Sequence, residues 1–358
     1  MKRTILILVG VIVALVLWDR FSSPKPVTQK SSNSASTNAA VAERISLRSR
    51  TAIGRPQGNS TNSESSDEDV FDRKKLSRDQ IEAYLLKTKR SPESLLNAFI
   101  ETGDTNFLAE AAKNFPENPI VQWTMLSKAS PEERSQSLEK LKTSSPDNAL
   151  PNYLSALDKF KAGNAEQALA EMDAASKKTT MSSFDKERSQ SREEMYLLSG
   201  YSSIEAKEEG IKTITLDALS QMKKLAQEIS GLQQKYKAAG DSSSAQELGA
   251  VGIEVGRRYA DEKNSPYVLN QLVGYAMENI ALKNLDSGTY YDFLGKTAGE
   301  RFQEIKNQKD EFKDLARSLP LYQNLNDSEK MIYWDRFQLY GEASALRWLK
   351  KTYGGETK

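Results

Sequence analysis

From about Lys75 onward, apolar side chains recur at the spacing of an α-helix. Ile81, Leu85 and Leu86 stand at i, i+4 and i+5, and the segment 95–100 repeats this grouping. Such spacing places the apolar side chains on one face of a helix. Runs of alternating apolar and polar residues bounded by turn residues do not occur in this part of the sequence. We therefore expect an all-α body with essentially no sheet.

Three short segments have the composition of helix starts. They are Ser91-Pro92-Glu93, Ser130-Pro131-Glu132-Glu133 and Ser265-Pro266. Proline is tolerated in the first turn, where its missing N–H would be unpaired anyway, and an acidic side chain there favours the helix dipole. We expect a helix to begin at each of the three.

Two similar segments lie 30 residues apart. Pro116-Glu117-Asn118 leads into Val121 and Trp123, and Pro146-Asp147-Asn148 leads into Pro151 and Tyr153. A period of this length, with a short helix pair in each unit, is typical of an α-solenoid. The repetition therefore predicts stacked helical hairpins.

Residues 146–176 (PDNALPNYLSALDKFKAGNAEQALAEMDAAS) resemble a tetratricopeptide repeat. The matching positions are the small residues Ala156, Ala168 and Ala175, the turn Gly163-Asn164, and Pro146, which corresponds to the proline closing the preceding repeat. The sequence departs from the family pattern on the first helix, where the aromatic residue, Phe160, falls one position late. The unit from Pro116 is shorter than the family norm and lacks the glycine turn. The resemblance implies degenerate helical-hairpin repeats over about 77–176 and does not identify a ligand.

The carboxy-terminal half has longer amphipathic segments. We expect helices over 184–208, 216–239, 245–262 and 266–285, with glycines at or near their breaks. The segment 176–183 (SKKTTMSS) predicts a flexible division between two parts. These are a repeat-like domain at 75–180 and a second helical domain at 181–358.

A final helix is expected at about 327–351. Its large side chains include Trp334, Phe337, Tyr340, Leu346 and Trp348. Core packing that closes the end of the solenoid is our preferred interpretation. A peptide-binding strip and a self-association interface are the alternatives.

The amino terminus has the pattern of a membrane anchor. An uncharged segment, Thr4–Trp18 (TILILVGVIVALVLW), lies between Lys2-Arg3 and Asp19-Arg20. As a helix its 15 residues cover roughly 22 Å. The hydrocarbon core is about 30 Å thick, and the flanking cations are long enough to reach the headgroups. We expect an uncleaved transmembrane signal-anchor within residues 1–21.

A cleaved signal peptide is the alternative, since this apolar length is typical of one. However, no cut within 18–23 (WDRFSS) places small residues at both required positions. Both interpretations keep the positively charged end in the cytoplasm and send the rest of the chain across the membrane. We expect a bacterial inner membrane, with the body facing the periplasm or cell envelope.

Residues 22–74 are rich in serine, threonine, asparagine, alanine and glycine. So few large apolar side chains cannot offset the entropy of ordering, which predicts a disordered linker. Its 49 residues from Ser22 to Val70 would span roughly 40 Å. A solvated spacer is the simpler interpretation. A basic strip resting on anionic lipid or a wall polymer is the alternative.

The overall composition excludes several kinds of chemistry. The 358 residues contain 50 Lys and Arg against 49 Asp and Glu, a formal net charge of +1, and neither cysteine nor histidine. Without these two residues there is no disulfide, thiolate, imidazole ligand or Ser-His-Asp triad. Basic pairs such as Lys74-Lys75 and Arg257-Arg258 are too sparse for a nucleic-acid footprint.

The glycine-rich segment Gly249–Gly256 (GAVGIEVG) superficially resembles a phosphate-binding loop. Its glycines and Ala245 are spaced by four, three and four residues inside an expected helix, which puts them on one helix face. A nucleotide fingerprint requires a preceding strand and glycines in the turn. We therefore predict close helix packing here.

Serine–lysine pairs could in principle replace a histidine-based nucleophile. Ser137/Lys140, Ser183/Lys186 and Ser220/Lys223 have the required spacing, but none has companion motifs. Their number is what chance produces in a chain this rich in both residues.

Acidic residues offer the remaining route to catalysis. Glu93-Ser94 superficially resembles the catalytic Glu-Ser pair of lytic transglycosylases, but it lies at a helix start and the family's Gly-Leu-Met-Gln-like segment is missing. Glu193-Glu194 and Glu208-Glu209 are expected on solvated faces. We identify no catalytic, cofactor-binding or metal-ligating residue. The sequence favours a non-catalytic, membrane-tethered adaptor that binds a protein or peptide on a concave helical surface, with an envelope-acting enzyme that uses a buried acid as the alternative.

Overall fold

The computed structural model describes residues 75–213, 217–264 and 266–355. In these residues the chain forms fifteen α-helices, so the prediction of an all-α body is confirmed. The first five are α2 (Arg78–Lys87), α3 (Pro92–Thr102), α4 (Thr105–Asn114), α5 (Pro119–Leu126) and α6 (Pro131–Ser144). They are followed by α7 (Leu150–Lys161), α8 (Ala165–Ser176), α9 (Asp185–Leu198) and α10 (Ser203–Gly210).

Longer helices make up much of the remainder. After the short 3-10 helix η1 (Ile211–Thr213) come α11 (Asp217–Ala238), α12 (Ser242–Ala260) and α13 (Val268–Leu282). After a hairpin of β1 (Tyr290–Tyr291) and β2 (Lys296–Thr297) come α14 (Ala298–Ala316), η2 (Leu319–Asn324), α15 (Asp327–Tyr340) and α16 (Glu342–Tyr353). The small hairpin pairs Tyr290 with Thr297 and was not predicted.

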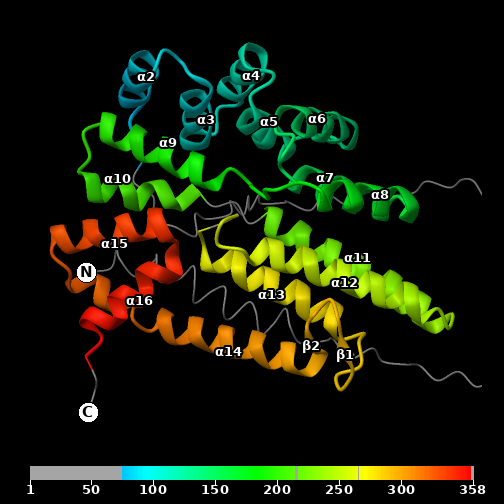
Figure 1. The fold of residues 1–358 in the computed structure, drawn as a ribbon. Coiled ribbons are helices and arrows are strands. Elements are labelled where there is room, and N and C mark those ends of the chain that lie inside the picture. Colours follow the sequence, from blue (N-terminus) through cyan, green and yellow to red (C-terminus); the bar gives the residue numbers. More distant parts are fainter. Residues whose placement is uncertain (1–74, 214–216, 265, 356–358) are drawn as a thin grey trace, which may run out of the picture.

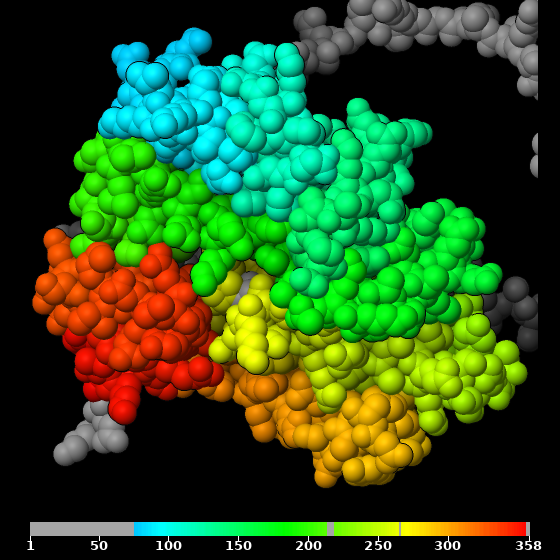
Figure 2. All heavy atoms as spheres, turned by 45° about the horizontal axis from the view of Figure 1, so that its top comes forward, coloured from blue at the N-terminus to red at the C-terminus, as the bar shows by residue number. Residues whose placement is uncertain are grey.

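The helices are stacked in layers (Figure 1). Helices α2–α6 lie above α9 and α10 on one side and above α7 and α8 on the other, with α11–α13 and then α14 beneath. Consecutive helices such as α7 and α8, or α11 and α12, pack against each other. Figure 2 shows the blue-to-green helices above the yellow and orange ones, with α15 and α16 in orange-red and red on the left. This neighbour-on-neighbour packing is what a helical repeat requires.

Serine caps begin several helices, as the sequence predicts. Ser91 caps α3 and Ser130 caps α6, in both cases with proline as the first helical residue. The Ser130 hydroxyl accepts from the backbone N–H of Glu133, whose carboxylate accepts from the Ser130 N–H. This reciprocal pair satisfies two amides that would otherwise be unpaired. The third predicted start is displaced, because α13 begins at Val268 with Tyr267 as its N-cap.

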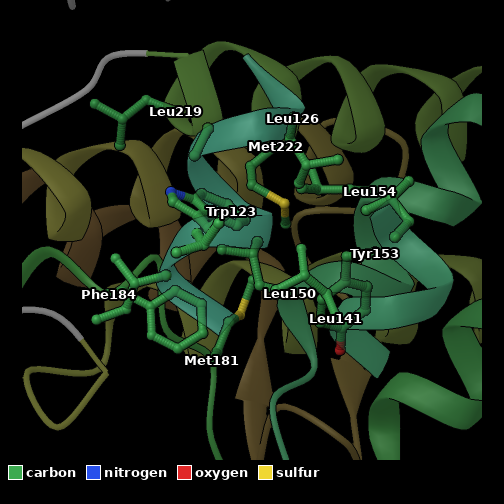
Figure 3. Close-up of a cluster of buried hydrophobic side chains, with 14 of the residues drawn as sticks. Trp123, Leu126, Leu141, Leu150, Tyr153, Leu154, Met181, Phe184, Leu219 and Met222 are labelled. Carbon is green, nitrogen blue, oxygen red and sulfur yellow. The ribbon is translucent and has the colours of Figure 1, made fainter. Parts of the chain in front are cut away.

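One hydrophobic cluster joins α5, α6, α7 and α11 (Figure 3). Trp123 of α5 packs edge-on against Phe184, with ring centroids 6.1 Å apart. Leu150 and Leu154 of α7 are each 1% exposed beside them. Burial of such side chains stabilises the fold by roughly 1.5–3 kcal/mol each. The upper helices and α11 therefore share one core.

A second cluster lies between α13, α14, η2, α15 and α16 and combines aliphatic with aromatic side chains. Trp334 is 1% exposed, and its indole N–H donates to the Tyr322 hydroxyl at 2.7 Å. Phe337 and Leu346 are also buried, which confirms the core interpretation for these three positions. Tyr340 is 61% exposed and contributes nothing to this core.

Helices α12 and α13 approach each other along a strip of glycines. A Cβ atom on Gly256 would lie 2.8 Å from the carbonyl oxygen of Gly274, and one on Gly252 would lie 3.0 Å from the Ala281 Cβ. Only hydrogen fits at such distances. The prediction that Gly249–Gly256 serves close packing is confirmed, since all of its glycines lie inside α12.

Two expected helices are interrupted. The helix predicted at 184–208 ends at Leu198, because Gly200 takes a φ of +90° and Ser202 caps a new helix with Glu205. The helix predicted at 327–351 breaks at Gly341, where φ is +83°. Positive φ is strained for residues with a Cβ, so glycine marks both turns.

Leu86 and the segment after α8 also differ from expectation. Leu86 is 81% exposed, since α2 buries only one edge of its apolar face. The segment 176–183, expected to be a flexible link, is held by backbone hydrogen bonds. The N–H of Ala149 donates to the Thr180 carbonyl at 2.9 Å, and the N–H of Thr180 donates to the Asp147 carbonyl at 3.0 Å.

The predicted anchor at 4–18 and linker at 22–74 lie outside the described residues. Among the helices that the structure describes, none combines the length and apolar character needed to cross a bilayer.

Candidate functional site: a groove between α8 and α12

An open groove with a volume of about 610 Å³ lies between α8 and α12. Its walls are formed chiefly by Leu169, Met172, Asp173 and Ser176 of α8 and by Ser244, Glu247, Val251 and Glu254 of α12. In Figure 2 the green spheres of α8 and the yellow-green spheres of the α11–α12 hairpin lie one above the other on the right. A volume of this size is within the range of ligand-binding sites.

The α8 wall follows from how this helix packs on α7. Ala168 and Ala175 are completely buried, on the side that faces the core. Alanine allows close approach between helices, and the turn between α7 and α8 uses Gly163 at a φ of +79°. The next positions around the helix, including Leu169, therefore border the groove.

The α12 wall follows from the glycine strip. Since Gly252 and Gly256 press against α13, the opposite face of α12 points away from the core. On that face Glu247 and Glu254 are exposed, and Val251 is 36% exposed between them. The same helix thus has a tightly packed side and an uncovered side.

Arg258 fixes the distance between the two walls at one end. Its guanidinium donates to the Tyr153 hydroxyl at 3.1 Å and to the Ala175 carbonyl at 2.9 Å, and it also donates to the Lys178 carbonyl. These carbonyls close the carboxyl end of α8, where the helix dipole favours a cation. Arg258 therefore links α12 to both α7 and α8.

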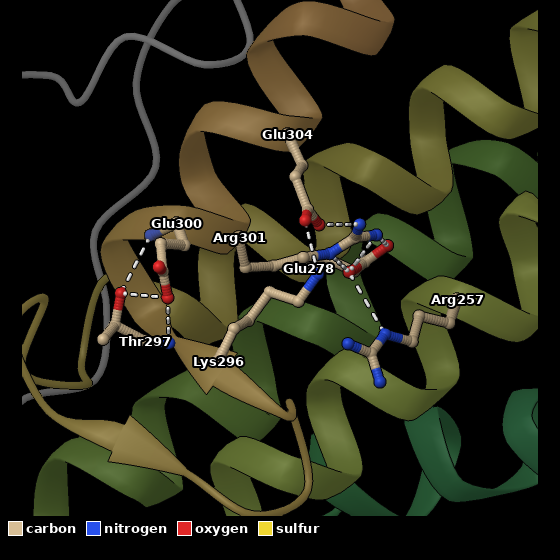
Figure 4. Close-up of polar contacts among 7 residues, drawn as sticks. All are labelled: Arg257, Glu278, Lys296, Thr297, Glu300, Arg301 and Glu304. Carbon is tan, nitrogen blue, oxygen red and sulfur yellow. Dashed lines mark hydrogen bonds and ion pairs between the residues drawn. The ribbon is translucent and has the colours of Figure 1, made fainter.

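Arg257 and Phe293 close the groove at this end. The Arg257 guanidinium lies 3.7 Å from the carboxylate of Glu278 and donates to the Phe293 carbonyl at 3.4 Å. Figure 4 shows Arg257 approaching Glu278 from α12 while Arg301 approaches it from α14. Phe293 belongs to the turn of the small β-hairpin. The hairpin that the sequence did not predict thus contributes to the groove.

Glu278 is fully buried, and Arg301 holds it with two hydrogen bonds of 2.8 Å each. Burial raises the pKa of Glu278, and the two guanidinium groups oppose that rise. Burial alone would lower the pKa of Arg301, but the charge of Glu278 and its hydrogen bonds hold it above its ordinary value. The positive charge of Arg257, which borders the groove, is therefore partly balanced by the buried carboxylate of Glu278.

The acids with raised pKa values do not line this groove. Burial raises the pKa of Glu342 to about 7, against one hydrogen bond from the backbone of Val268. Glu278 lies beneath Arg257, and Asp185, whose pKa burial also raises, lies beside Arg188. A catalytic acid would need to combine such a shift with access to substrate. The acids that border the groove are the exposed residues Asp173, Glu247 and Glu254.

In two of the serine–lysine pairs the serine and the lysine are in different surroundings. Ser183 donates to Asp185, two residues along, and Ser137 is buried while Lys140 is exposed. Lys223 is partly buried, which lowers its pKa. None of the three pairs borders the groove.

The paired glutamates behave differently from expectation. Glu193 binds Lys207 at 3.0 Å, and Glu209 is 2% exposed beside Lys212. Glu208 accepts a hydrogen bond from Tyr322 at 2.9 Å. The expectation of solvated faces is therefore wrong at these three positions, because each carboxylate is held by a neighbouring side chain. Glu93, by contrast, lies in the first turn of α3, as predicted.

A second groove of about 560 Å³ lies between α9 and α15. Leu197 and Leu339 border it, but Lys207, Glu193 and Gln338, which also border it, bind one another. Among the residues that the structure describes, no three His, Cys, Asp or Glu side chains are grouped as metal ligands. We therefore place the candidate site between α8 and α12.

Sequence reasoning missed the residues that define this groove. The sequence identifies Arg257 and Arg258 only as a basic pair and does not single out Phe293. A signal was nevertheless present, since Ser244, Glu247, Val251 and Glu254 repeat at intervals of three and four opposite the glycine face.

In comparisons with known proteins, no family model matches this chain, and no significant match to a curated protein or a solved structure was found.

Proposed function

We propose that this chain is a non-catalytic scaffold or adaptor that is tethered to a membrane and holds another protein in the groove between α8 and α12. The segment 4–18 would anchor it, and residues 22–74 would be the linker between the anchor and the helical body. The body would lie outside the cytoplasm, at the periplasmic face of a bacterial inner membrane.

The observation that carries this proposal is the uncovered face of α12. Val251 and its acidic neighbours form a helix face that no described element covers, while the opposite face is packed as tightly as glycine allows. A helix face of this kind is typical of protein–protein contact, in which another helix supplies the missing packing. Rigid helices on both sides of the groove support binding without rearrangement.

The tetratricopeptide-like nature of the upper helices is part of the proposal. The antiparallel pair α7 and α8 has the buried alanines and the glycine turn on which the resemblance rests. Proteins built from such pairs present extended curved surfaces, and their ligands are diverse. The resemblance therefore supports a binding role and does not select a partner.

A test of location comes first. In spheroplasts that express the full chain, protease added from outside should digest the helical body without lysis. Protection of the body until the membrane is lysed would overturn the extracytoplasmic placement. Fractionation should recover the intact chain with membranes, and replacement of Leu8 and Val13 by lysine should release it or abolish its export.

A test of the groove follows in the same cells. A photo-crosslinking amino acid at Val251 should give a discrete product with another protein, whereas the same probe at Tyr290, which is 59% exposed, should not. Equal products at the two positions, or none at Val251 under any growth condition, would overturn the groove as the binding surface. An enzyme remains the less favoured alternative, because the acids with raised pKa values lie away from the groove.

A further inference from the structure

We propose that the partner segment in the groove between α8 and α12 is a basic amphipathic helix belonging to another protein. This inference rests on the proposed function and adds the chemical class and secondary structure of the ligand. Three features of the groove carry it, namely the spacing of its wall residues, its apolar floor and its charge.

The wall residues on both helices are spaced by three and four residues, which is the spacing of a helix face that packs against another helix. On α12, Ser244, Glu247, Val251 and Glu254 follow one another at intervals of three, four and three. On α8, Leu169, Met172, Asp173 and Ser176 have the same kind of spacing. Such rows form ridges that a neighbouring helix packs into. A third helix lying between these two rows would complete a three-helix arrangement.

The length of the groove sets the length of the occupant. From Ser244 to Arg257 the α12 wall rises roughly 20 Å, at 1.5 Å per residue. Tyr236 borders the groove near the α11–α12 turn, and Phe293 closes the other end. A helix of about 14 residues would match this length.

Apolar side chains line the floor and part of both walls. Met172 of α8 is 4% exposed and lies at the floor, whereas Leu169 of α8, Val251 of α12 and Phe293 of the hairpin turn are more exposed on the walls. An occupant therefore needs an apolar stripe with anchors at i, i+3 or i+4, and i+7, the pattern that helices in hydrophobic grooves present.

The charges at the groove favour a basic occupant. Three carboxylates border it, those of Asp173, Glu247 and Glu254, against the one guanidinium of Arg257. Arg257 already lies beside Glu278, and Asp173 contacts Lys177 one turn away on the exposed side of α8. In the part of the chain that the structure describes, Glu247 and Glu254 have no ion-pair partner. Two turns apart on α12, they would pair with lysine or arginine side chains at a similar interval.

Fluorescence anisotropy with a labelled synthetic helix tests this proposal directly. The probe is a 14-residue peptide of leucine and lysine with leucines at helical spacing, and the controls are a scrambled peptide and a leucine–glutamate peptide. The protein is the full chain in a zwitterionic detergent, and every variant is measured in the same detergent so that micelle binding cancels. We expect saturable binding of the leucine–lysine peptide only.

The charge-reversed variant Glu247→Lys/Glu254→Lys should bind the basic peptide at least tenfold more weakly and should gain affinity for the acidic peptide. A matched control is Glu117→Lys/Glu132→Lys, which makes the same charge change at two exposed positions on other elements and should leave binding within twofold of the unaltered chain. Val251→Asn should also weaken binding of the basic peptide, because it removes an apolar contact and leaves the charge of the groove unchanged. Circular dichroism verifies that each variant is folded.

Several outcomes would overturn the proposal. They are equal weakening in the control variant, binding of the scrambled peptide as tightly as the ordered one, and preference for the acidic peptide by the unaltered chain.

Deletion of residues 44–55 (RISLRSRTAIGR) provides a further experiment. If it raised peptide affinity tenfold or more, the occupant would be this chain's own basic segment and not a partner. Crosslinking at Val251 without peptide binding would leave the scaffold role intact and reject only the basic helix.

Discussion

The guanidinium of Arg192 on α9 lies 2.8 Å from the carboxylate of Glu101 at the end of α3, and the two side chains are 0% and 3% exposed. The second oxygen of Glu101 accepts the backbone N–H of Leu76 at 2.9 Å. The pair therefore joins the upper layer to the layer beneath it, across 91 residues of sequence.

Removal of one partner of this pair should be strongly destabilising. Glu101→Gln keeps an acceptor for the Leu76 amide but leaves the Arg192 charge buried without a counter-charge, which typically costs about 3–5 kcal/mol. The double variant Glu101→Gln/Arg192→Met should recover part of this loss, because it removes the buried charge. Urea unfolding followed by circular dichroism measures both differences.

An exposed pair provides the control for this experiment. Arg347 and Glu311 are 2.9 Å apart, but their side chains are 49% and 47% exposed. Exposed pairs contribute at most about 1 kcal/mol. A Glu311→Gln variant as unstable as Glu101→Gln would contradict the role assigned to burial.

Substitution by alanine should change the stability of the protein in opposite directions at two glycines that both lie inside helices. On Gly256 a Cβ would lie 2.8 Å from the Gly274 carbonyl, so Gly256→Ala must push α12 and α13 apart. The expected cost of such overpacking, about 1–3 kcal/mol, exceeds the gain of about 1 kcal/mol in helix propensity. Thermal unfolding should show a midpoint several degrees lower.

The matched control is Gly231 of α11, where a Cβ would meet nothing within 4 Å. Gly231→Ala should therefore stabilise the chain by up to about 1 kcal/mol through propensity alone. Gly252→Leu, which meets Ala281 and Ile229, should be more damaging than Gly256→Ala. Equal effects of alanine at Gly256 and Gly231 would show that helix contact is not what the glycine strip serves.

Local features of this fold were predictable from local sequence. The serine–proline starts at Ser91 and Ser130 satisfy amides within three residues, and the glycine strip of α12 is visible as a spacing. Such features involve neighbours along the chain, so composition and period identify them. Gly341 permits the break in the helix predicted at 327–351, but the contact that holds the break is remote in sequence, since the Glu342 amide donates to the Pro266 carbonyl.

Features of the groove required knowledge of the tertiary structure. Arg258 and its acceptors are separated by some 80 or more residues, and nothing in the pair Arg257-Arg258 shows that one side chain points to α8 and the other to Glu278. The partners of two glutamates expected in solvent are equally remote, since Glu208 accepts from Tyr322 and Glu193 accepts from Gln338. Partners of charged side chains depend on packing between layers, which the sequence pattern does not encode locally.

Loss of the Tyr322 hydroxyl should clearly lower the stability of the fold, although it removes only one atom from the side chain. The hydroxyl accepts the indole N–H of Trp334 at 2.7 Å and donates to Glu208 at 2.9 Å. Tyr322→Phe preserves the packing but leaves a buried indole N–H unpaired, which costs about 1–3 kcal/mol. Calorimetry should show a clear drop in the unfolding midpoint. The control Tyr340→Phe, at a position 61% exposed, should leave the midpoint almost unchanged.

The carboxyl of Glu342 should make stability depend on pH. It begins α16, accepts the Val268 amide at 2.8 Å, and lies close to the buried rings of Tyr267 and Tyr333. No cation is paired with it among the described residues. Burial raises its pKa to about 7 in the folded chain, from an ordinary value of 4.5.

Because the folded chain holds this proton more tightly than the unfolded chain, the contribution of Glu342 to stability is greatest below pH 4.5. It falls between pH 4.5 and 7 and is lost above 7. Glu342→Gln cannot ionise and still accepts the Val268 amide. The variant should therefore match the unaltered chain at pH 4 and exceed its stability at pH 8 by on the order of 3 kcal/mol.

Glu110→Gln is a control in which the pKa shift has the opposite direction, since hydrogen bonds from Arg90 lower the pKa of Glu110. Its substitution should destabilise at pH 7 and have little effect at pH 3. Urea unfolding across this pH range distinguishes the two slopes, and a Glu342→Gln difference that does not change with pH would reject the buried carboxyl as the cause.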